Sequence, residues 1–236
     1  MRDRVPGPVE LFVWCLGFVL EVAVLVCAIR AKVFLRYLPL SLYMTACAMG
    51  DLLRFRILFH YGYTSREYFY FYYYSDALLT VALFFALISL FVHVFKEMNA
   101  EKYVIFGATF LLSATALFSY LVIAQSQERF LSQFVVELSQ NLYFVGLVLT
   151  YVLWGAILKL RETRSQLIQL VLSLGVYFSL FAANYAVRNL YPSSIWLSSA
   201  LDQIFGCLLP LAWAYAFWRI PKDARLAPSG LAVIPR

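Results

Sequence analysis

Charged residues are scarce in this chain of 236 amino acids: they make up 14% of it, whereas hydrophobic residues make up 63%. A soluble domain carries about 25% charged residues. A chain so poor in charge cannot cover its surface with polar groups, so lipid is the expected solvent for most of it. The composition excludes an ordinary soluble domain and predicts an integral membrane protein in contact with the lipid bilayer.

Residues that bind metals or haem are also few. The two histidines, His60 and His93, fall at opposite ends of their predicted helices and so cannot ligate one haem. The cysteines lie in apolar runs without metal-ligand spacing, which is typical of small buried side chains. These cysteines are Cys15, Cys27, Cys47 and Cys207. We therefore expect no metal site and no cofactor.

Catalytic and phosphate-binding motifs are absent as well. The sequence contains no HExxH, no CxxC and no glycine-rich phosphate loop, and no Ser–His–Asp set can be assembled at one depth. The basic residues are scattered between apolar segments and form no continuous patch, which argues against nucleic acid as a partner. We expect the protein not to be an enzyme.

Seven apolar stretches are long enough for membrane-spanning helices, which need about 20 mostly apolar residues. We expect an all-α bundle of seven transmembrane helices that forms one domain over residues 1–218, followed by a short tail at 219–236. The uncharged fourth stretch presents Thr109, Ser113 and Ala116 at helical spacing, which favours close packing on that face. The predicted spans are 9–29, 37–58, 69–95, 103–124, 131–158, 166–188 and 194–218.

Lysine and arginine are distributed unevenly between the two sides of this bundle. Seven belong to the N-terminus and the second, fourth and sixth connections, and twelve to the other connections and the tail. The positive-inside rule places the more basic side in the cytoplasm. The N-terminus is therefore expected outside and the tail inside. Short loops and the lack of an Asn-x-Ser/Thr sequon favour a bacterial inner membrane.

An unbroken run of seven aromatic residues, Tyr68–Tyr74, leads into the third span, and Asp76 follows closely. Tyr72 and Tyr73 precede Asp76 by four and three residues, so the three side chains are expected to share one helix face. Tyrosine faces attract cations, and the carboxylate supplies a full counter-charge. This stretch therefore predicts a site for an external cationic or amine-bearing ligand.

Polar side chains on five spans fall at one level, about 6 to 12 Å below the outer helix ends at about 1.5 Å per residue. Charged groups inside a membrane usually face the bundle interior and mark function. Arg54 or Arg188 is expected to hold Asp76 when no ligand is bound. The alternative is that these groups pair only with one another and fix the helices together. The candidate ligand-binding residues, expected to converge on the bundle axis, are Asp51, Arg54, Tyr72, Tyr73, Asp76, Glu137, Asn141, Asn184, Arg188 and Asp202.

Glu21 stands apart from these residues, about 18 Å deep in the first span at about 1.5 Å per residue. No partner is expected at its level, so this carboxyl is expected to be protonated. It then either carries protons, contacts a ligand or hydrogen-bonds to a neighbouring helix.

Known seven-helix families were compared on their motifs. The layout is that of rhodopsins and G-protein-coupled receptors, but the seventh span has no lysine for retinal and no Asn-Pro-x-x-Tyr pattern, and the third has no Asp-Arg-Tyr. Asp76 and Asp202 each precede a Lys-acid pair by twenty residues. This similarity resembles the parallel three-plus-one-plus-three repeat of the sugar transporters called SWEETs, whose Pro-Gln loop motif is missing. No family is assigned.

The function expected from these observations is that of a receptor-like or accessory membrane protein with a polar cavity at its outer face. A small-solute or ion transporter with carboxylate coupling groups is the first alternative, and a structural subunit of a membrane complex is the second. A receptor of this kind needs a membrane or cytoplasmic protein partner. A closed interior below Asp76 favours the receptor, and a water path from there past Glu21 favours transport.

Overall fold

A computed structural model describes residues 7–62, 65–96, 101–124, 130–160, 162–191, 195–221 and 224–225. The described residues are almost entirely α-helical, so the all-α prediction is confirmed. Each predicted span coincides with a helix to within three residues at either end. The helices are α1 (Pro8–Arg30), α2 (Leu38–Tyr61), α3 (Arg66–Phe95), α4 (Glu101–Ala124), α5 (Phe130–Lys159), α6 (Ser165–Leu190) and α7 (Ile195–Arg219).

Local signals set several helix ends. α3 begins earlier than predicted because the hydroxyl of Ser65 accepts the amide of Tyr68 at 3.1 Å and caps the helix. α2 ends at Gly62, whose φ of 82° is a backbone conformation that glycine adopts without strain. The α1–α2 connection turns through Lys32, which has a φ of 55°.

Six of the helices are long and apolar enough to cross a membrane, as judged by length and composition: α1, α3, α4, α5, α6 and α7. The remaining helix, α2, carries Asp51, Arg54 and Arg56 in its second half, which make it less apolar than the others. An integral multi-pass membrane protein is the class that fits these helices.

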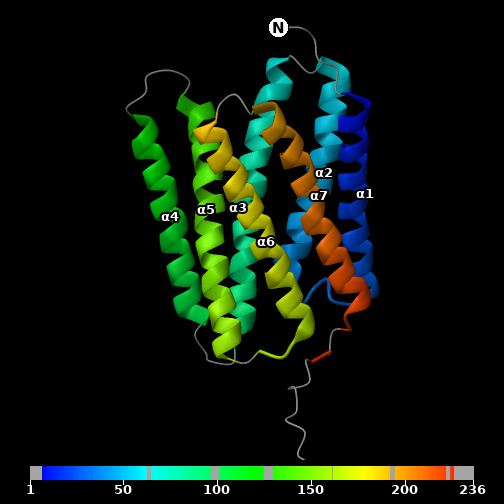
Figure 1. Cartoon of the computed structure of the whole chain (residues 1–236), viewed down its shortest axis with the longest axis vertical. Coiled ribbons are helices and arrows are strands. Elements are labelled where there is room, and N and C mark those ends of the chain that lie inside the picture. The colour runs from blue at the N-terminus through cyan, green and yellow to red at the C-terminus, as the bar shows by residue number, and fades with distance from the viewer. Residues whose placement is uncertain are drawn as a thin grey trace, which may run out of the picture.

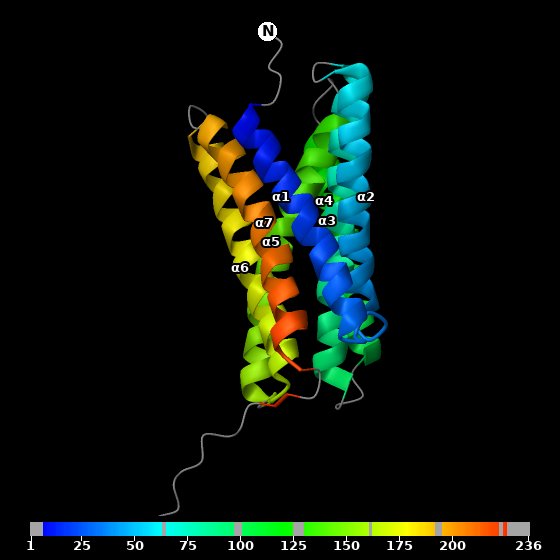
Figure 2. The same cartoon turned by 90° about the vertical axis from the view of Figure 1, so that its right-hand side faces the viewer.

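The helices run alternately up and down the bundle (Figure 1). α1, α2, α3, α5, α6 and α7 form a ring in which each helix contacts the next and α7 closes onto α1. α4 lies at the edge, against α5 and α3 (Figure 1). α1 crosses diagonally from α7 towards α2 (Figure 2). The first three helices thus contact one another in sequence order, and the last three do the same. In the sequence, α4 lies between these two groups of three.

The close-packed face of α4 is not the predicted one. Thr109 and Ser113 are exposed, whereas Thr115 and Ser119 are buried. Ser119 accepts a hydrogen bond from the side chain of Asn141 on α5 at 3.0 Å. The prediction was wrong because small side chains occur on more than one face of α4, and the polar partner on α5 decides which face packs.

The apolar core occupies one half of the bundle. We call the end where α1, α3, α5 and α7 finish the inner end, following the predicted orientation, and the opposite end the outer end. Large side chains with at most 1% exposure fill the space between helices towards the inner end. They include Leu40, Met44, Leu87, Leu90, Leu153, Leu167 and Trp213. Most polar candidate residues therefore lie in the other half, nearer the outer end.

Candidate functional site

Arg54 of α2 is the centre of the polar contacts in the outer half. Its Nη1 lies 3.7 Å from Oδ1 of Asp51, and the two side chains are 12% and 17% exposed. Its Nε and Nη2 donate to the hydroxyl of Ser75 on α3 at 2.9 and 2.7 Å. The guanidinium also lies over the ring of Tyr72, 4.7 Å from the centroid. Arg54 therefore joins α2 to the first turns of α3 by charge, hydrogen bonds and a cation–π contact.

Asp76 follows Ser75 on α3 without a direct ion pair to Arg54 in the described structure. Its main-chain carbonyl accepts the hydroxyl of Thr80 at 2.9 Å. Its carboxyl is close enough to Arg54 for their charges to interact. Arg54 thus holds Asp51 and Ser75 directly and affects Asp76 only through its charge.

An aromatic cluster between α5 and α6 was not predicted from the sequence. The ring of Tyr143 on α5 lies 5.1 Å from that of Phe181 and 5.6 Å from that of Tyr185. Tyr177 and Phe181 are 4.5 Å apart, again between centroids. Tyr177, Phe181 and Tyr185 follow one another at four-residue intervals on α6 and so share one face. This spacing is a signal that the sequence does contain.

The carboxyls of Asp76 on α3 and Asp202 on α7, from opposite halves of the chain, lie within range of each other's charge. Tyr185 lies near both carboxyls, and so does Tyr72. Three of the predicted residues, Tyr72, Asp76 and Asp202, thus lie within electrostatic range of one another, and Tyr185 lies within range of both carboxyls.

Asn184 of α6 positions Asp202. The Asn184 side chain is nearly fully buried, and its Nδ2 donates to Oδ1 of Asp202 at 2.6 Å and to the carbonyl of Ser198 at 3.0 Å. The Oδ1 of Asn184 and the hydroxyl of Ser198 are buried without a hydrogen-bond partner among the described residues. Arg188 is the other arginine that was predicted to hold Asp76. Its side chain is exposed, and it interacts with Asp202 only through its charge.

Other predicted residues are occupied elsewhere. Asn141 donates to Ser119 and so faces the edge helix α4. Glu137, one turn earlier on α5, is half-buried. The ring of Tyr73 packs on that of Phe69 with centroids 4.4 Å apart, which keeps it within the aromatic run.

Glu21 lies midway along α1, and its Oε2 is buried without a hydrogen-bond partner among the described residues. The carboxyl is not electrostatically alone, because Asp51 and Arg54 of α2 interact with its charge. The thiols of Cys47 and Cys207 are also within range of it. Glu21 thus extends the polar group of the outer half towards α1.

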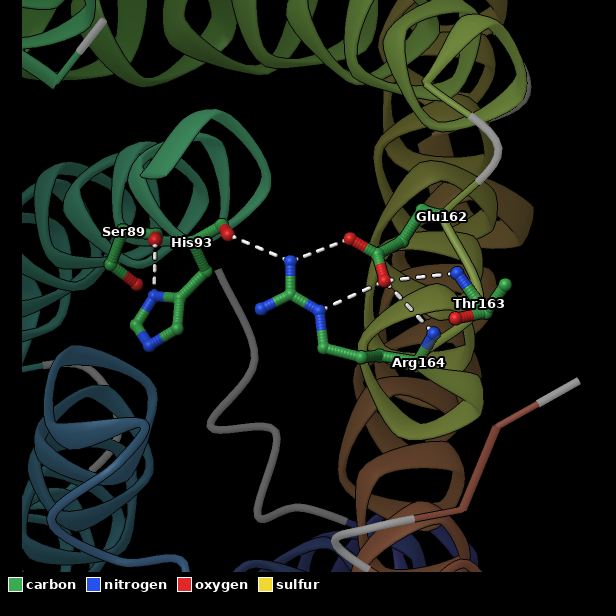
Figure 3. Close-up of polar contacts among 5 residues, drawn as sticks. All are labelled: Ser89, His93, Glu162, Thr163 and Arg164. Atoms are coloured by element: carbon green, nitrogen blue, oxygen red, sulfur yellow. Dashed lines mark hydrogen bonds and ion pairs between the residues drawn. The ribbon is translucent and has the colours of Figure 1, made fainter. Parts of the chain in front are cut away.

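A second polar cluster, not predicted from the sequence, lies at the inner end (Figure 3). Arg164, in the α5–α6 connection, donates through Nε to Glu162 at 2.8 Å and through Nη2 to the carbonyl of His93 at 3.0 Å. Glu162 also accepts the amides of Thr163 and Arg164 at 3.0 and 2.9 Å. The hydrogen bonds to Glu162 hold the pKa of its carboxyl below the ordinary value. The hydrogen bond from the Arg164 side chain contributes most to this shift.

His93 and Gln166 continue this inner cluster across the bundle. The Nδ1 of His93 lies 2.7 Å from the carbonyl of Ser89, and its Nε2 lies 3.0 Å from the carbonyl of Arg36 in the α1–α2 connection. Gln166 of α6 donates to the carbonyls of Ala216 and Ile220 at 3.4 and 3.2 Å. At the inner end, side chains from α3, α6 and the α5–α6 connection therefore bind main-chain carbonyls of other segments and hold these segments together.

No family model matches the chain, and neither a curated protein nor a solved structure is significantly similar to it.

Proposed function

We propose that this protein is a receptor-like or accessory membrane protein that binds a small cationic ligand in its outer half. The support is an excess of acid in that half. Glu21, Asp51, Asp76 and Asp202 are all half-buried there. Arg54 is the one guanidinium buried among them in the described structure. An interior with more carboxyls than cations favours the entry of a positive charge.

The proposal includes seven membrane spans, with α2 as the seventh. α2 has 24 residues, which gives a length of about 36 Å at about 1.5 Å per residue. Its ion pair faces the bundle, where charge within a membrane is tolerated. Seven spans place the two termini on opposite sides, and the basic residues place the N-terminus outside.

The observation that carries the site is that Asp76 and Asp202 lie within range of each other's charge. Like charges within range repel each other, so a cation held near both carboxyls is favoured. The rings of Tyr72 and Tyr185 lie within range of both carboxyls. Arg54 already lies over the ring of Tyr72, so Tyr185 is the ring left to attract a ligand's cation. We place the ligand's positive group between Asp76, Asp202 and Tyr185.

The unpaired polar atoms near Asp202 indicate the class of cation. The Oδ1 of Asn184 is an acceptor, and the hydroxyl of Ser198 accepts as readily as it donates. A primary ammonium brings three N–H donors, whereas a quaternary ammonium brings none. Because buried acceptors gain most when they are paired, a ligand with a primary amine suits this site better.

The closed inner half supports binding rather than passage. Leu87, Leu90, Leu153 and Trp213 are fully buried there and leave the inner half filled with apolar side chains. A transporter is the second candidate, and Glu21 favours it, because this carboxyl has a buried oxygen without a hydrogen-bond partner among the described residues. Such a group inside a membrane suits proton coupling.

The test is thermal unfolding of the purified protein in lipid nanodiscs with a panel of amines. Ethylammonium is expected to raise the melting temperature of the native protein, and tetramethylammonium to raise it less. Saturation to 100 times Kd corresponds to about 2.7 kcal/mol of stabilisation. Asp202→Asn and Asp76→Asn keep the side-chain shape and remove the charge, so both are expected to lose this response.

Glu67→Gln is the control, since it removes an exposed carboxyl in the first turn of α3 and should respond like the native protein. If no amine stabilises the native protein, or if both Asn variants respond as it does, the site is not a cation site. Uptake of ethylammonium by sealed proteoliposomes would establish the transporter in place of the receptor.

A further inference from the structure

The connection between α1 and α2 presents three basic side chains within seven residues. Arg30 ends α1, Lys32 and Arg36 follow in the connection at residues 31–37, and all three are exposed. The connection itself contains no aspartate or glutamate. Figure 2 shows it at the inner end, where α1 finishes. The α1–α2 connection is therefore a local concentration of positive charge at one end of the bundle.

Lys32 has a left-handed backbone conformation, with a φ of 55°. The amide of Val33 donates to the carbonyl of Ala28, and that of Lys32 donates to the carbonyl of Ile29, both at 3.0 Å. These two hydrogen bonds form the Schellman motif that ends many helices, and glycine usually occupies its left-handed position. A lysine is strained there, and residues kept in strained conformations cluster at functional sites. The strain indicates that the lysine side chain has a role of its own.

The rest of the connection holds these cations in place. Val33 and Tyr37 are 0% and 2% exposed, so they anchor the connection in the core. The guanidinium of Arg36 lies over the ring of Tyr37, 5.7 Å from the centroid. The carbonyl of Arg36 lies 3.0 Å from Nε2 of His93 on α3. Leu35 is 81% exposed and leaves an apolar side chain next to the basic ones on the surface.

Trp218, near the end of α7, indicates where the membrane surface lies at this end of the bundle. Its ring is exposed, and the guanidinium of Arg219 lies 5.5 Å from its centroid. Tryptophan concentrates at the interface between hydrocarbon and lipid headgroups. Because α1 and α7 both finish at the inner end, the α1–α2 connection lies at the level of the headgroups.

We propose that Arg30, Lys32 and Arg36 bind the phosphate group of an anionic phospholipid. Leu35 then contacts the acyl chains of the same lipid. Guanidinium and ammonium groups form charge-assisted hydrogen bonds with phosphate oxygens. A zwitterionic headgroup brings a cation that the three basic groups repel, whereas an anionic headgroup does not.

The carboxylate of Glu162 does not replace the lipid as the partner of these cations. It lies at the same end of the bundle, but Arg164 already donates to it through Nε at 2.8 Å. The positive charge of the α1–α2 connection is thus left for a lipid. The proposal is independent of the amine site, which lies in the outer half.

Native mass spectrometry of the purified protein in a neutral detergent tests the site, with phosphatidylglycerol and phosphatidylcholine as probes. The native protein is expected to bind phosphatidylglycerol more tightly. Arg30→Gln combined with Arg36→Gln should weaken this binding about fivefold per residue, which corresponds to about 1 kcal/mol for each cation near an anionic surface. Arg56→Gln combined with Arg66→Gln, at exposed positions of the outer half, is the matched control and should bind like the native protein. Absence of a preference for phosphatidylglycerol, or equal affinities of the two double variants, would overturn the proposal.

Two substitutions of Lys32 separate its charge from its backbone strain. Lys32→Gln removes the charge and keeps the strain, whereas Lys32→Gly removes both. Both variants are expected to bind phosphatidylglycerol about fivefold more weakly. Without this lipid, Lys32→Gly should melt at a higher temperature than Lys32→Gln, because glycine adopts a φ of 55° without strain. A glycine variant that binds the lipid as tightly as the native protein would contradict the role of Lys32.

Inorganic phosphate distinguishes a lipid site from a site for a soluble anion. An excess of phosphate is expected to leave phosphatidylglycerol bound, because the lipid alone also contacts Leu35. Leu35→Ser should therefore weaken lipid binding. Displacement of the lipid by inorganic phosphate, with no effect of Leu35→Ser, would assign the site to a soluble anion and overturn the lipid proposal.

Discussion

At the scale of single residues, the carboxyls at the two ends of the bundle differ in their hydrogen-bond and ion-pair partners. In the outer half, Asp76 and Asp202 lie within range of each other's charge, and neither forms an ion pair with an arginine in the described structure. At the inner end, Glu162 accepts the side chain and the amide of Arg164. A carboxylate with several donors remains ionised, whereas two neighbouring carboxyls need a shared proton or a cation. The inner carboxylate therefore serves stability, and the outer pair suits binding.

A substitution that removes the charge of Glu162 should lower the stability of the folded protein. The folded-state pKa of Glu162 lies below its ordinary value, so its stabilising effect is complete above that value and is lost as the pH falls through the folded-state pKa. Glu162→Gln is expected to cost about 1.5 kcal/mol near neutral pH, the lower end for hydrogen bonds to charged groups. The cost should shrink below about pH 4.3.

Melting curves of the native protein and Glu162→Gln across acidic pH measure this difference. Glu67→Gln, at an exposed position in the first turn of α3, is the control and should change little. A difference between native protein and Glu162→Gln that grows on acidification would contradict the assigned role.

At the scale of helices, α5 and α6 pack most closely where glycines occur. A Cβ added to Gly146 of α5 would lie 2.4 Å from the ring of Phe178 on α6. A Cβ added to Gly175 of α6 would lie 2.9 Å from Thr150 on α5. The two glycines therefore set how near the helices come, and with it the position of the aromatic cluster that includes Tyr143 and Tyr185.

Alanine at Gly146 should force the two helices apart, because Phe178 is 1% exposed and its ring has no room to move aside. The expected cost is about 1–3 kcal/mol, as for overpacking elsewhere. Gly155→Ala on the same helix is the matched control: nothing lies within 4 Å of the added Cβ. It should be neutral or stabilising, since alanine favours helix over glycine by about 1 kcal/mol. Equal melting temperatures for the two variants would refute the packing argument.

At the scale of the whole molecule, the orientation of the bundle in the membrane has a direct test. Arg66, at the start of α3, and Lys159, at the end of α5, are exposed at opposite ends of the bundle. In a background without native cysteines, Arg66→Cys is expected to react with an impermeant maleimide on intact cells. Lys159→Cys is expected to react only after permeabilisation. The reverse pattern would invert the orientation, and reaction of both on intact cells would exclude the seven-span topology.

The sequence by itself determined the helices. A segment in lipid must satisfy its backbone internally, so an apolar run of sufficient length becomes a helix whatever its neighbours are. It also determined pairs that share one helix, such as Asp51 with Arg54, since a spacing of three residues fixes their proximity.

Only the tertiary structure decided which faces meet. These helices are apolar nearly all round, so periodicity gives little indication of which side turns towards a neighbour. Asn141 accordingly faces α4, although it was among the residues expected to converge on the bundle axis. The contact of Arg164 with the carbonyl of His93 joins residues 71 apart and uses a main-chain acceptor. Every residue carries such an acceptor, so no residue type in the sequence marks where this contact forms.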